Sequence, residues 1–281
     1  IMSNHVQMSY YFLFVILFIV GAYFEDAWRN KTLPKFFKAS AVVFVAALIG
    51  VAANLSNLYH TYTYSKETMR GKSELVETGD AAKQTSSGLD RDYITNWSYG
   101  IGETWTLLVP NFKGGSSSAP LSQSETAMEK ANPVYSSLYN SFPQYFGDQP
   151  WTAGPVYVGS FVLFLFVLGC FIVKGPLKWA LLGATFFSIV LAWGKNFMPL
   201  TDFFIDYIPM YNKFRAVSSI LVIAEFTIPL LAIFALKHVL DEPGIWKKYK
   251  KAFGISLALT AGVALLLAVA PGSLGSGFVP A

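Results

Sequence analysis

The sequence predicts an all-α integral membrane protein of about six transmembrane helices, with a large extracytoplasmic loop between the second and the third. Composition is the first reason, because 53% of the 281 residues are hydrophobic and only 14% are charged. Soluble domains carry about 25% charged residues. The second reason is that the apolar residues gather in long runs, and the third is that Lys and Arg gather in the short loops between them.

Charge and cysteine content exclude several classes of protein. The net charge of +4 comes largely from these short loops, where it is a signal of membrane topology and requires no nucleic-acid partner. The single cysteine, Cys170, lies inside an apolar run, so the sequence carries neither a disulfide framework nor a Cys/His metal site.

Residues 1–59 are expected to form a transmembrane helical hairpin. Its two apolar runs cover residues 8–24 and about 36–59, and small residues in the second run suit close helix packing. The chain opens on Ile1 with a polar segment, which predicts that it is a piece of a longer protein.

Residues 60–154 are polar, contain no run long enough to cross a membrane, and are far longer than a normal connection. They predict an extracytoplasmic loop or small domain, with an amphipathic helix over residues 92–109 that Pro110 ends. Aromatic residues near its end favour anchoring at the membrane interface over a ligand cage. They are Tyr135, Tyr139, Phe142, Tyr145, Phe146 and Trp151.

Residues 155–281 predict four further spans, with an interfacial segment at 195–216 between the second and third of them. The expected spans cover residues 155–173, 179–193, 217–236 and 253–270. The three short basic loops at 25–38, 174–178 and 237–251 fall on one side, which the positive-inside rule makes cytoplasmic. The start of the chain, the 60–154 loop and the C-terminus are then extracytoplasmic.

Lys213 and Arg215 are the strongest candidate site residues. A basic pair just before a span can hold a phosphate through charge-assisted hydrogen bonds, with Arg as a bidentate fork. The alternative is an interfacial anchor whose basic side chains reach lipid headgroups. Because the predicted topology places this pair outside, where positive charge is not required, the phosphate site is favoured.

Glu225 and His5 are the other candidates for binding. A carboxylate inside a span costs a few kcal/mol, so Glu225 is expected to face the helix bundle and to have a partner. It either binds substrate or makes a structural hydrogen bond to a neighbour such as Thr227. His5, with Asn4 and Gln7, either contacts a polar substrate group or only caps the first helix.

A metal site is only weakly indicated. Asp202 and Asp206 lie four residues apart and would share one face of a helix, but two carboxylates alone are a poor divalent-cation site. No metal or cofactor is therefore assigned.

Four segments of the chain resemble the YfhO-like family of bacterial membrane proteins, and in particular its Bacteroidetes-type members. They are NHVQMSYYF at 4–12, YGIGETWTLLVPNFKGGSSS at 99–118, QYFGDQPWTAGPVYVG at 144–159 and WGKNFMPLTDFFIDYIPMYNKFRAVSSILVIAE at 193–225. The resemblance spans most of residues 4–240. Its motifs are specific to the family but do not identify a mechanism.

The resemblance implies a membrane glycosyltransferase of the GT-C type in the bacterial inner membrane. Such enzymes move a sugar from a polyprenyl-phosphate carrier to an acceptor on the extracytoplasmic face, here a cell-envelope glycan. Lys213 and Arg215 would then hold the carrier phosphate. These enzymes carry a catalytic aspartate in the first extracytoplasmic loop. Since this chain begins later, the catalytic base is expected to lie outside it, and neither Asp202 nor Asp206 is assigned that role.

Two other functions fit the same sequence. A transporter or channel would use Glu225, with Pro229 breaking the helix to open backbone groups to a cavity. A non-catalytic membrane scaffold would bind a partner through its extracytoplasmic loop.

Overall fold

The computed structural model describes residues 5–68, 88–135, 137–270 and 272. Within these ranges the chain forms helices and no β-strand beyond two isolated bridges. The α-helices are α1 (Val6–Arg29), α2 (Leu33–Ala52), α3 (Leu55–Lys66), α4 (Arg91–Thr95), α5 (Glu125–Lys130), α6 (Ser160–Ile172), α7 (Pro176–Ala192), α8 (Met198–Tyr207), α9 (Val222–Asp241), α10 (Ile245–Lys248), α11 (Lys250–Leu257) and α12 (Val263–Val269). They form two compact units, one of residues 1–96 and 174–227 and the other of residues 97–173 and 228–281.

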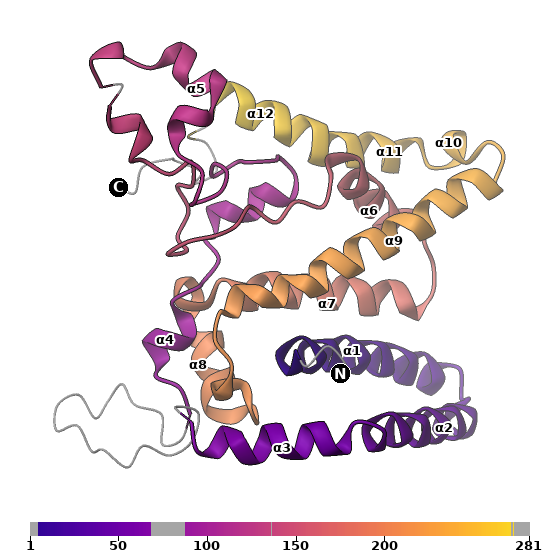
Figure 1. The fold of residues 1–281 in the computed structure, drawn as a ribbon. Helices are drawn as coiled ribbons and strands as arrows, with labels where there is room; N and C mark the ends of the chain where they lie inside the picture. Colours follow the sequence, from indigo (N-terminus) through magenta and orange to yellow (C-terminus); the bar gives the residue numbers. More distant parts are fainter. Residues whose placement is uncertain (1–4, 69–87, 136, 271, 273–281) are drawn as a thin grey trace. The chain divides into compact units, whose positions relative to one another are not determined.

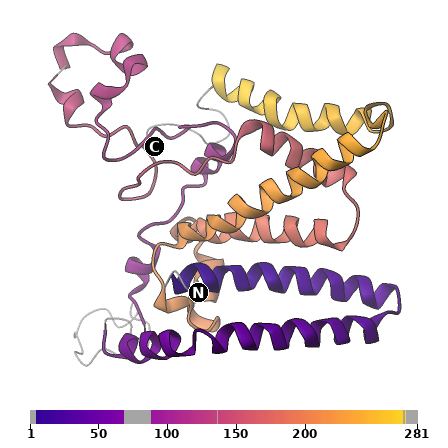
Figure 2. The same cartoon turned by 45° about the vertical axis from the view of Figure 1, so that its right-hand side comes forward.

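The first unit is built on α1, which packs on α7 and runs antiparallel to α2 (Figure 1 and Figure 2). The turn between α1 and α2 places Lys31 in a left-handed conformation, with φ of 56°. Aromatic side chains of α1 fill the contact with α7: the rings of Phe18 and Phe187 lie 5.5 Å apart. The outer faces of α2 are not buried by other parts of the protein, as expected for a helix whose surroundings are lipid.

A sharp bend separates α7 from α8. The segments Pro176–Ala192 and Gly194–Tyr207 meet at 108°, and Gly194 occupies a left-handed conformation at the bend, with φ of 49°. The buried hydroxyl of Thr201 donates to the Gly194 carbonyl over 2.9 Å, which satisfies one backbone acceptor at the bend. The bend therefore directs α8 away from the axis of α7.

The second unit packs α6 against α11 and the π-helical turn Ala258–Gly262 that follows it. Gly169 of α6 lies against Leu231 and Ala235 of α9, where an added Cβ atom would stand 3.1 Å from the Leu231 side chain. Between residues 97 and 159 the chain is irregular, with α5 and several 3₁₀ turns. The two isolated bridges, Gly114 with Tyr145 and Pro120 with Pro143, hold this region together.

Four described helical segments are long and apolar enough to cross a membrane, or five if the bent α7–α8 pair is one span. The four are Val6–Arg29, Leu33–Ala52, Val217–Asp241 and Lys250–Val269. The prediction of a helical membrane protein is confirmed at this level, and the count of six stays a prediction. The difference arises at α6, whose 13 residues fall short of the ~20 that a bilayer requires.

The helix predicted over residues 92–109 is wrong. The chain forms α4, turns, and then forms the 3₁₀ helix Gly102–Leu107. The reason is local, because the Gly100 N–H donates to the side chain of Glu103 over 2.6 Å instead of to a helical carbonyl. The predicted second run to residue 59 also divides, into α2 and α3.

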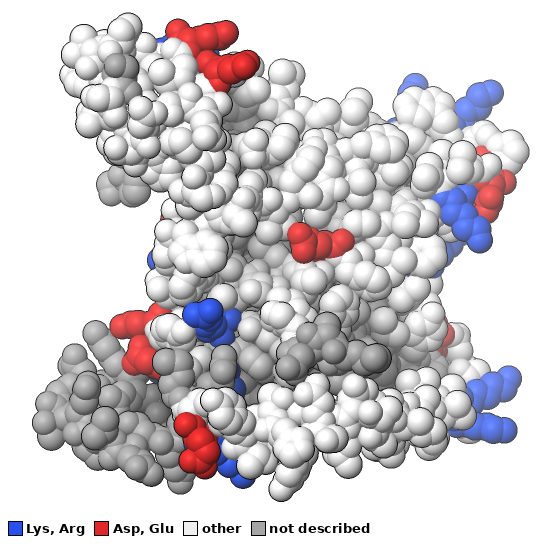
Figure 3. Space-filling model, viewed as in Figure 1, with Lys and Arg blue, Asp and Glu red and all other residues white. Residues whose placement is uncertain are grey.

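Charged side chains are sparse over the helices on the face that Figure 3 shows, and Lys and Arg gather mainly at the helix ends and turns. Residues without a formal charge cover most of the area between them. This distribution is the one expected of helices whose sides face lipid and whose ends face water.

Candidate functional site

The basic pair lies in a tight loop between α8 and α9. Met210 and Ala216 bracket it in left-handed conformations, with φ of 67° and 58°, which cost free energy for residues with a side chain. Between them, Tyr211–Lys213 form a 3₁₀ turn, and the Asn212 carbonyl accepts from the Leu89 N–H over 2.9 Å. The conformation of the loop is thus set by several independent contacts.

Helix α1 supports this loop from its N-terminal turns. Gln7 donates through Nε2 to the backbone oxygen of Arg215 over 2.7 Å and to the hydroxyl of Tyr11 over 2.8 Å. Tyr10 donates to the Pro209 carbonyl over 2.9 Å. Because α1 bonds the backbone on both sides of the loop, the position of the basic pair is coupled to this helix.

Arg215 is exposed, and its guanidinium Nη1 donates to the hydroxyl of Tyr93 over 2.8 Å. Its Cζ atom lies 5.8 Å from the centre of the same ring, within the range of a cation–π contact. Lys213 is partly buried, and this burial lowers the pKa of its ammonium. An anion bound beside Lys213 would favour the charged form and offset that cost.

Arg91 joins the two carboxylates of α8. Its guanidinium forms ion pairs with Asp202 and, at 2.5 Å, with Asp206. The two acids share one face of α8, as predicted, but they face an arginine. The described ranges contain no group of three or more His, Cys, Asp and Glu side chains that could hold a metal ion.

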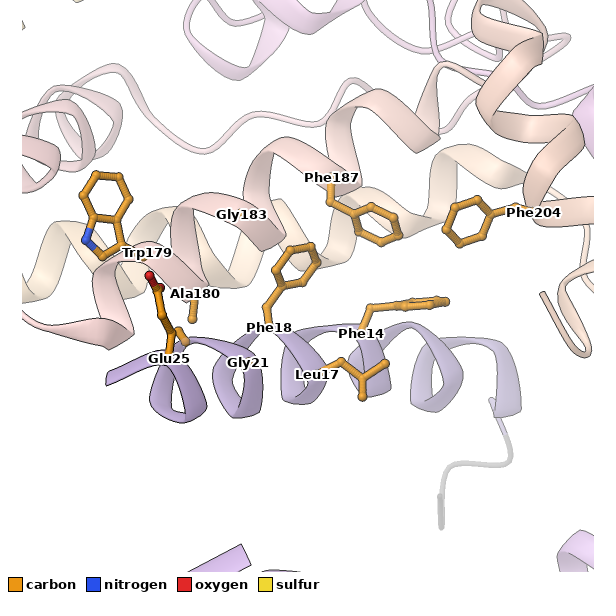
Figure 4. A pocket seen from close by; sticks show the side chains of 11 residues that line it. Phe14, Leu17, Phe18, Gly21, Glu25, Trp179, Ala180, Gly183, Phe187 and Phe204 are labelled. Atoms are coloured by element: carbon orange, nitrogen blue, oxygen red, sulfur yellow. The ribbon is translucent and has the colours of Figure 1, made fainter. Parts of the chain in front are cut away.

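An apolar groove of about 480 Å³ lies between α1 and α7 (Figure 4). Four phenylalanine rings, Phe14, Phe18, Phe187 and Phe204, lie along it, and Gly21 and Gly183 widen it. Phe204 lies at one end of the groove, and Glu25 and Trp179 lie at the other end.

Aromatic rings connect this groove to the basic pair. Phe14 contacts Tyr10 with ring centres 5.3 Å apart, and Tyr10 contacts Phe214 at 5.1 Å. Phe214 lies between Lys213 and Arg215 in the sequence. A chain of ring contacts through Phe14, Tyr10 and Phe214 therefore runs from the lining of the groove to the loop that carries the two cationic side chains.

Glu225 does not face the helix bundle. Its side chain is exposed in the first turn of α9. Thr227, the partner expected for it, bonds instead to the Thr185 hydroxyl over 2.7 Å. Helix α9 runs unbroken through Pro229, so the helix break expected for a transporter is not present.

His5 is exposed and precedes α1, and no side chain caps the N-terminus of that helix. Asn4 lies outside the described residues. Gln7 contacts the loop that carries the basic pair. The sequence pointed to Gln7 only because it lies close to His5.

The second unit contains a buried carboxylate, Glu103, that the sequence did not predict. Glu103 is 3% exposed, and it accepts hydrogen bonds from the Tyr145 hydroxyl at 2.5 Å, from the Gly100 N–H at 2.6 Å and from the Asp148 N–H at 3.3 Å. The Tyr145 hydroxyl in turn accepts from the Gln149 N–H over 2.9 Å. Burial, followed by the hydrogen bond to Glu103, raises the pKa of Tyr145.

The carboxylate of Glu103 packs against two glycines, Gly100 and Gly147. An added Cβ atom at Gly100 would stand 2.9 Å from a Glu103 oxygen, and one at Gly147 would stand 2.3 Å from the other oxygen. The sequence places Glu103 beside Gly100 and Gly102 in YGIGET, and it places Gly147 in YFGD. Neither segment suggests a buried charge until the fold brings them together.

The described residues define the class of the protein as helical, with several helices long and apolar enough to span a membrane. Comparison of the chain with protein-family models, with curated proteins and with solved structures found no match. The resemblance to the YfhO-like family therefore stays a prediction from its motifs.

Proposed function

We propose that the first unit binds the polyprenyl-phosphate carrier of a GT-C-like membrane glycosyltransferase, which moves a sugar to an extracytoplasmic glycan acceptor. One observation carries this proposal: a chain of aromatic contacts joins the lining of the apolar groove between α1 and α7 to the loop of Lys213 and Arg215. An amphiphile with one phosphate and a long hydrocarbon chain matches both parts.

Charge determines which end of the groove suits the phosphate. At one end Glu25 contributes a carboxylate, which pairs with Arg29 over 2.5 Å. At the other end the aromatic path reaches two cations. A phosphate is favoured at the second end by the Coulomb attraction to Lys213 and Arg215 and by the bidentate geometry that a guanidinium offers.

The chemistry assigned to this unit is binding and leaving-group stabilisation. In the transfer, the bond between the anomeric carbon and the phosphate oxygen breaks, the acceptor hydroxyl attacks that carbon, and the polyprenyl phosphate leaves with the additional negative charge. Arg215 and Lys213 would stabilise this charge as it develops. The base that takes the acceptor proton is not assigned to any residue of this chain.

Substitution of Arg215 tests the proposal. Arg215→Ala in membranes carrying the complete protein is expected to lower sugar transfer by about a hundredfold, the scale on which removal of a transition-state donor acts, with unchanged protein abundance. Arg29→Ala is the matched control, because Arg29 pairs with Glu25, which lines the groove at the end away from the basic pair. Full activity of Arg215→Ala, or an equal loss in Arg29→Ala, would contradict the proposal.

A further inference from the structure

Two tryptophans of the second unit form a fixed aromatic surface. The ring of Trp151 lies 6.0 Å from that of Trp97 and perpendicular to it, and Trp97 donates through Nε1 to the Trp151 carbonyl over 3.2 Å. Trp151 remains 59% exposed. A large apolar ring is thus presented to the outside in one orientation.

The backbone beside Trp151 is also fixed. The Ser117 N–H donates to the Thr152 carbonyl over 3.0 Å, and the Thr152 N–H donates to the Ser117 hydroxyl over 2.9 Å. These bonds tie the segment to the GGSSS sequence at residues 114–118. An exposed side chain on a fixed backbone loses little conformational entropy when it binds a ligand.

A carboxylate lies next to this surface. Asp148 is exposed, and its Oδ2 atom would stand 2.9 Å from a Cβ atom added at Gly100. The short segment from Trp97 to Gly100 therefore contacts Trp151 at its start and Asp148 at its end. The buried Glu103 holds Asp148 in place through the Asp148 N–H.

We propose that Trp97, Asp148 and Trp151 form a carbohydrate-binding surface. A pyranose ring has an apolar face of C–H groups, which packs on the negative face of an indole, and a rim of hydroxyls, which donate to a carboxylate in charge-assisted hydrogen bonds. Trp151 supplies the first kind of contact and Asp148 the second, and the two lie against opposite ends of the short segment from Trp97 to Gly100. As the acceptor site this surface rests on the proposed transfer reaction, whereas as a binding surface for carbohydrate it stands without it.

Anchoring in the membrane interface is the other use of exposed tryptophan. It is disfavoured here because insertion of Trp151 would carry Asp148 toward the acyl layer, and desolvation of a carboxylate costs free energy. A sugar ligand leaves that carboxylate hydrated or hydrogen-bonded.

The test measures binding by the whole chain in lipid nanodiscs, with malto-, cello- and chito-oligosaccharides as probes and glycerol as the negative control. Saturable binding to at least one series is expected. Trp151→Ala should weaken it about fivefold or more, and Asp148→Asn should weaken it as well. Trp246→Ala, which removes another exposed tryptophan of the same unit, should leave it unchanged.

Trp151→Ala keeps the bond from Trp97, because that bond ends on the backbone, so the variant should fold. Absence of saturable binding to all three series would overturn the proposal. So would quenching of Trp151 fluorescence by brominated lipids, which would show that this side chain inserts into the bilayer. Absence of sugar transfer by the unaltered protein, together with saturable oligosaccharide binding, would count against the proposed function alone.

Discussion

The two units use carboxylates in opposite ways. In the second unit, Glu103 is buried and accepts hydrogen bonds from three donors, all within its own region of the chain. In the first unit, Asp202 and Asp206 are partly exposed, with side chains 42% and 44% accessible, and share the guanidinium of Arg91.

The buried carboxylate therefore has a structural role, whereas the exposed carboxylates belong to a surface that can rearrange. A buried carboxylate whose donors are fixed cannot be removed without leaving those donors unsatisfied. An exposed ion pair exchanges with water and salt at little cost. The Glu103 network therefore holds the irregular region of the second unit, whereas the charges of the first unit remain available to ligands.

Glu103→Ala should have the largest effect. It leaves the Tyr145 hydroxyl and two backbone N–H groups without their acceptor, so the free energy of unfolding of the second unit should fall by ~3–5 kcal/mol. Limited proteolysis within residues 97–159, in detergent, measures this loss. Glu129→Ala, at an exposed position of α5, is the control and should change the cleavage rate little. Equal cleavage rates for Glu103→Ala and Glu129→Ala would show that the buried carboxylate is no more important to stability than an exposed one.

The pair Tyr145→Phe and Tyr211→Phe should come next. Both tyrosines are buried, but the Tyr145 hydroxyl bonds to Glu103 while that of Tyr211 has no hydrogen-bond partner among the described residues. Loss of the first hydroxyl should cost ~1–2 kcal/mol, and loss of the second should be neutral or stabilising. Thermal unfolding of both variants checks this, and the opposite ranking would refute it.

Arg91→Ala should destabilise the protein less than Glu103→Ala or Tyr145→Phe does. Because the ion pairs are partly exposed, their removal should cost about 1 kcal/mol or less, and the cost should shrink in high salt. Melting curves at low and high ionic strength provide the measurement. A loss as large as that of Glu103→Ala, or one that salt does not change, would show that this ion-pair cluster is structural.

The sequence was sufficient for the features that repeat along the chain. Apolar runs predict α1, α2, α9 and the α11–α12 segment, because crossing a bilayer requires length and composition alone. The basic pair was also found, since Lys213 and Arg215 are close in sequence. Three features depend on contacts between distant segments, and the sequence did not predict them. They are the hydrogen bond from Gln7 to Arg215, the ion pairs of Arg91 with the carboxylates of α8, and the Glu103 network.

Glu225 shows the limit most plainly. Its position in an apolar run predicts a buried, paired carboxylate, but α9 begins only at Val222 after a 3₁₀ turn, and the side chain emerges on an exposed face. A change of helix type within one apolar run rotates every later residue, and hydropathy carries no signal for it.

The groove is the central claim, and filling it is the most direct test. Gly21 lines the groove, and an added Cβ atom there would meet nothing within 4 Å. Gly254 of α11 is equally open but belongs to the other unit, so Gly254→Leu is the matched control. The measurement is the affinity of the purified protein for a long-chain polyprenyl phosphate and for geranyl phosphate.

Gly21→Leu should weaken binding of the long-chain lipid about tenfold, because displacing two methylene groups from apolar surroundings forfeits ~1.6 kcal/mol. Binding of geranyl phosphate, whose short chain need not reach Gly21, should change much less, and Gly254→Leu should bind both lipids as the unaltered protein does. Unchanged affinity of Gly21→Leu for the long-chain lipid would contradict the assignment of the groove to the carrier chain.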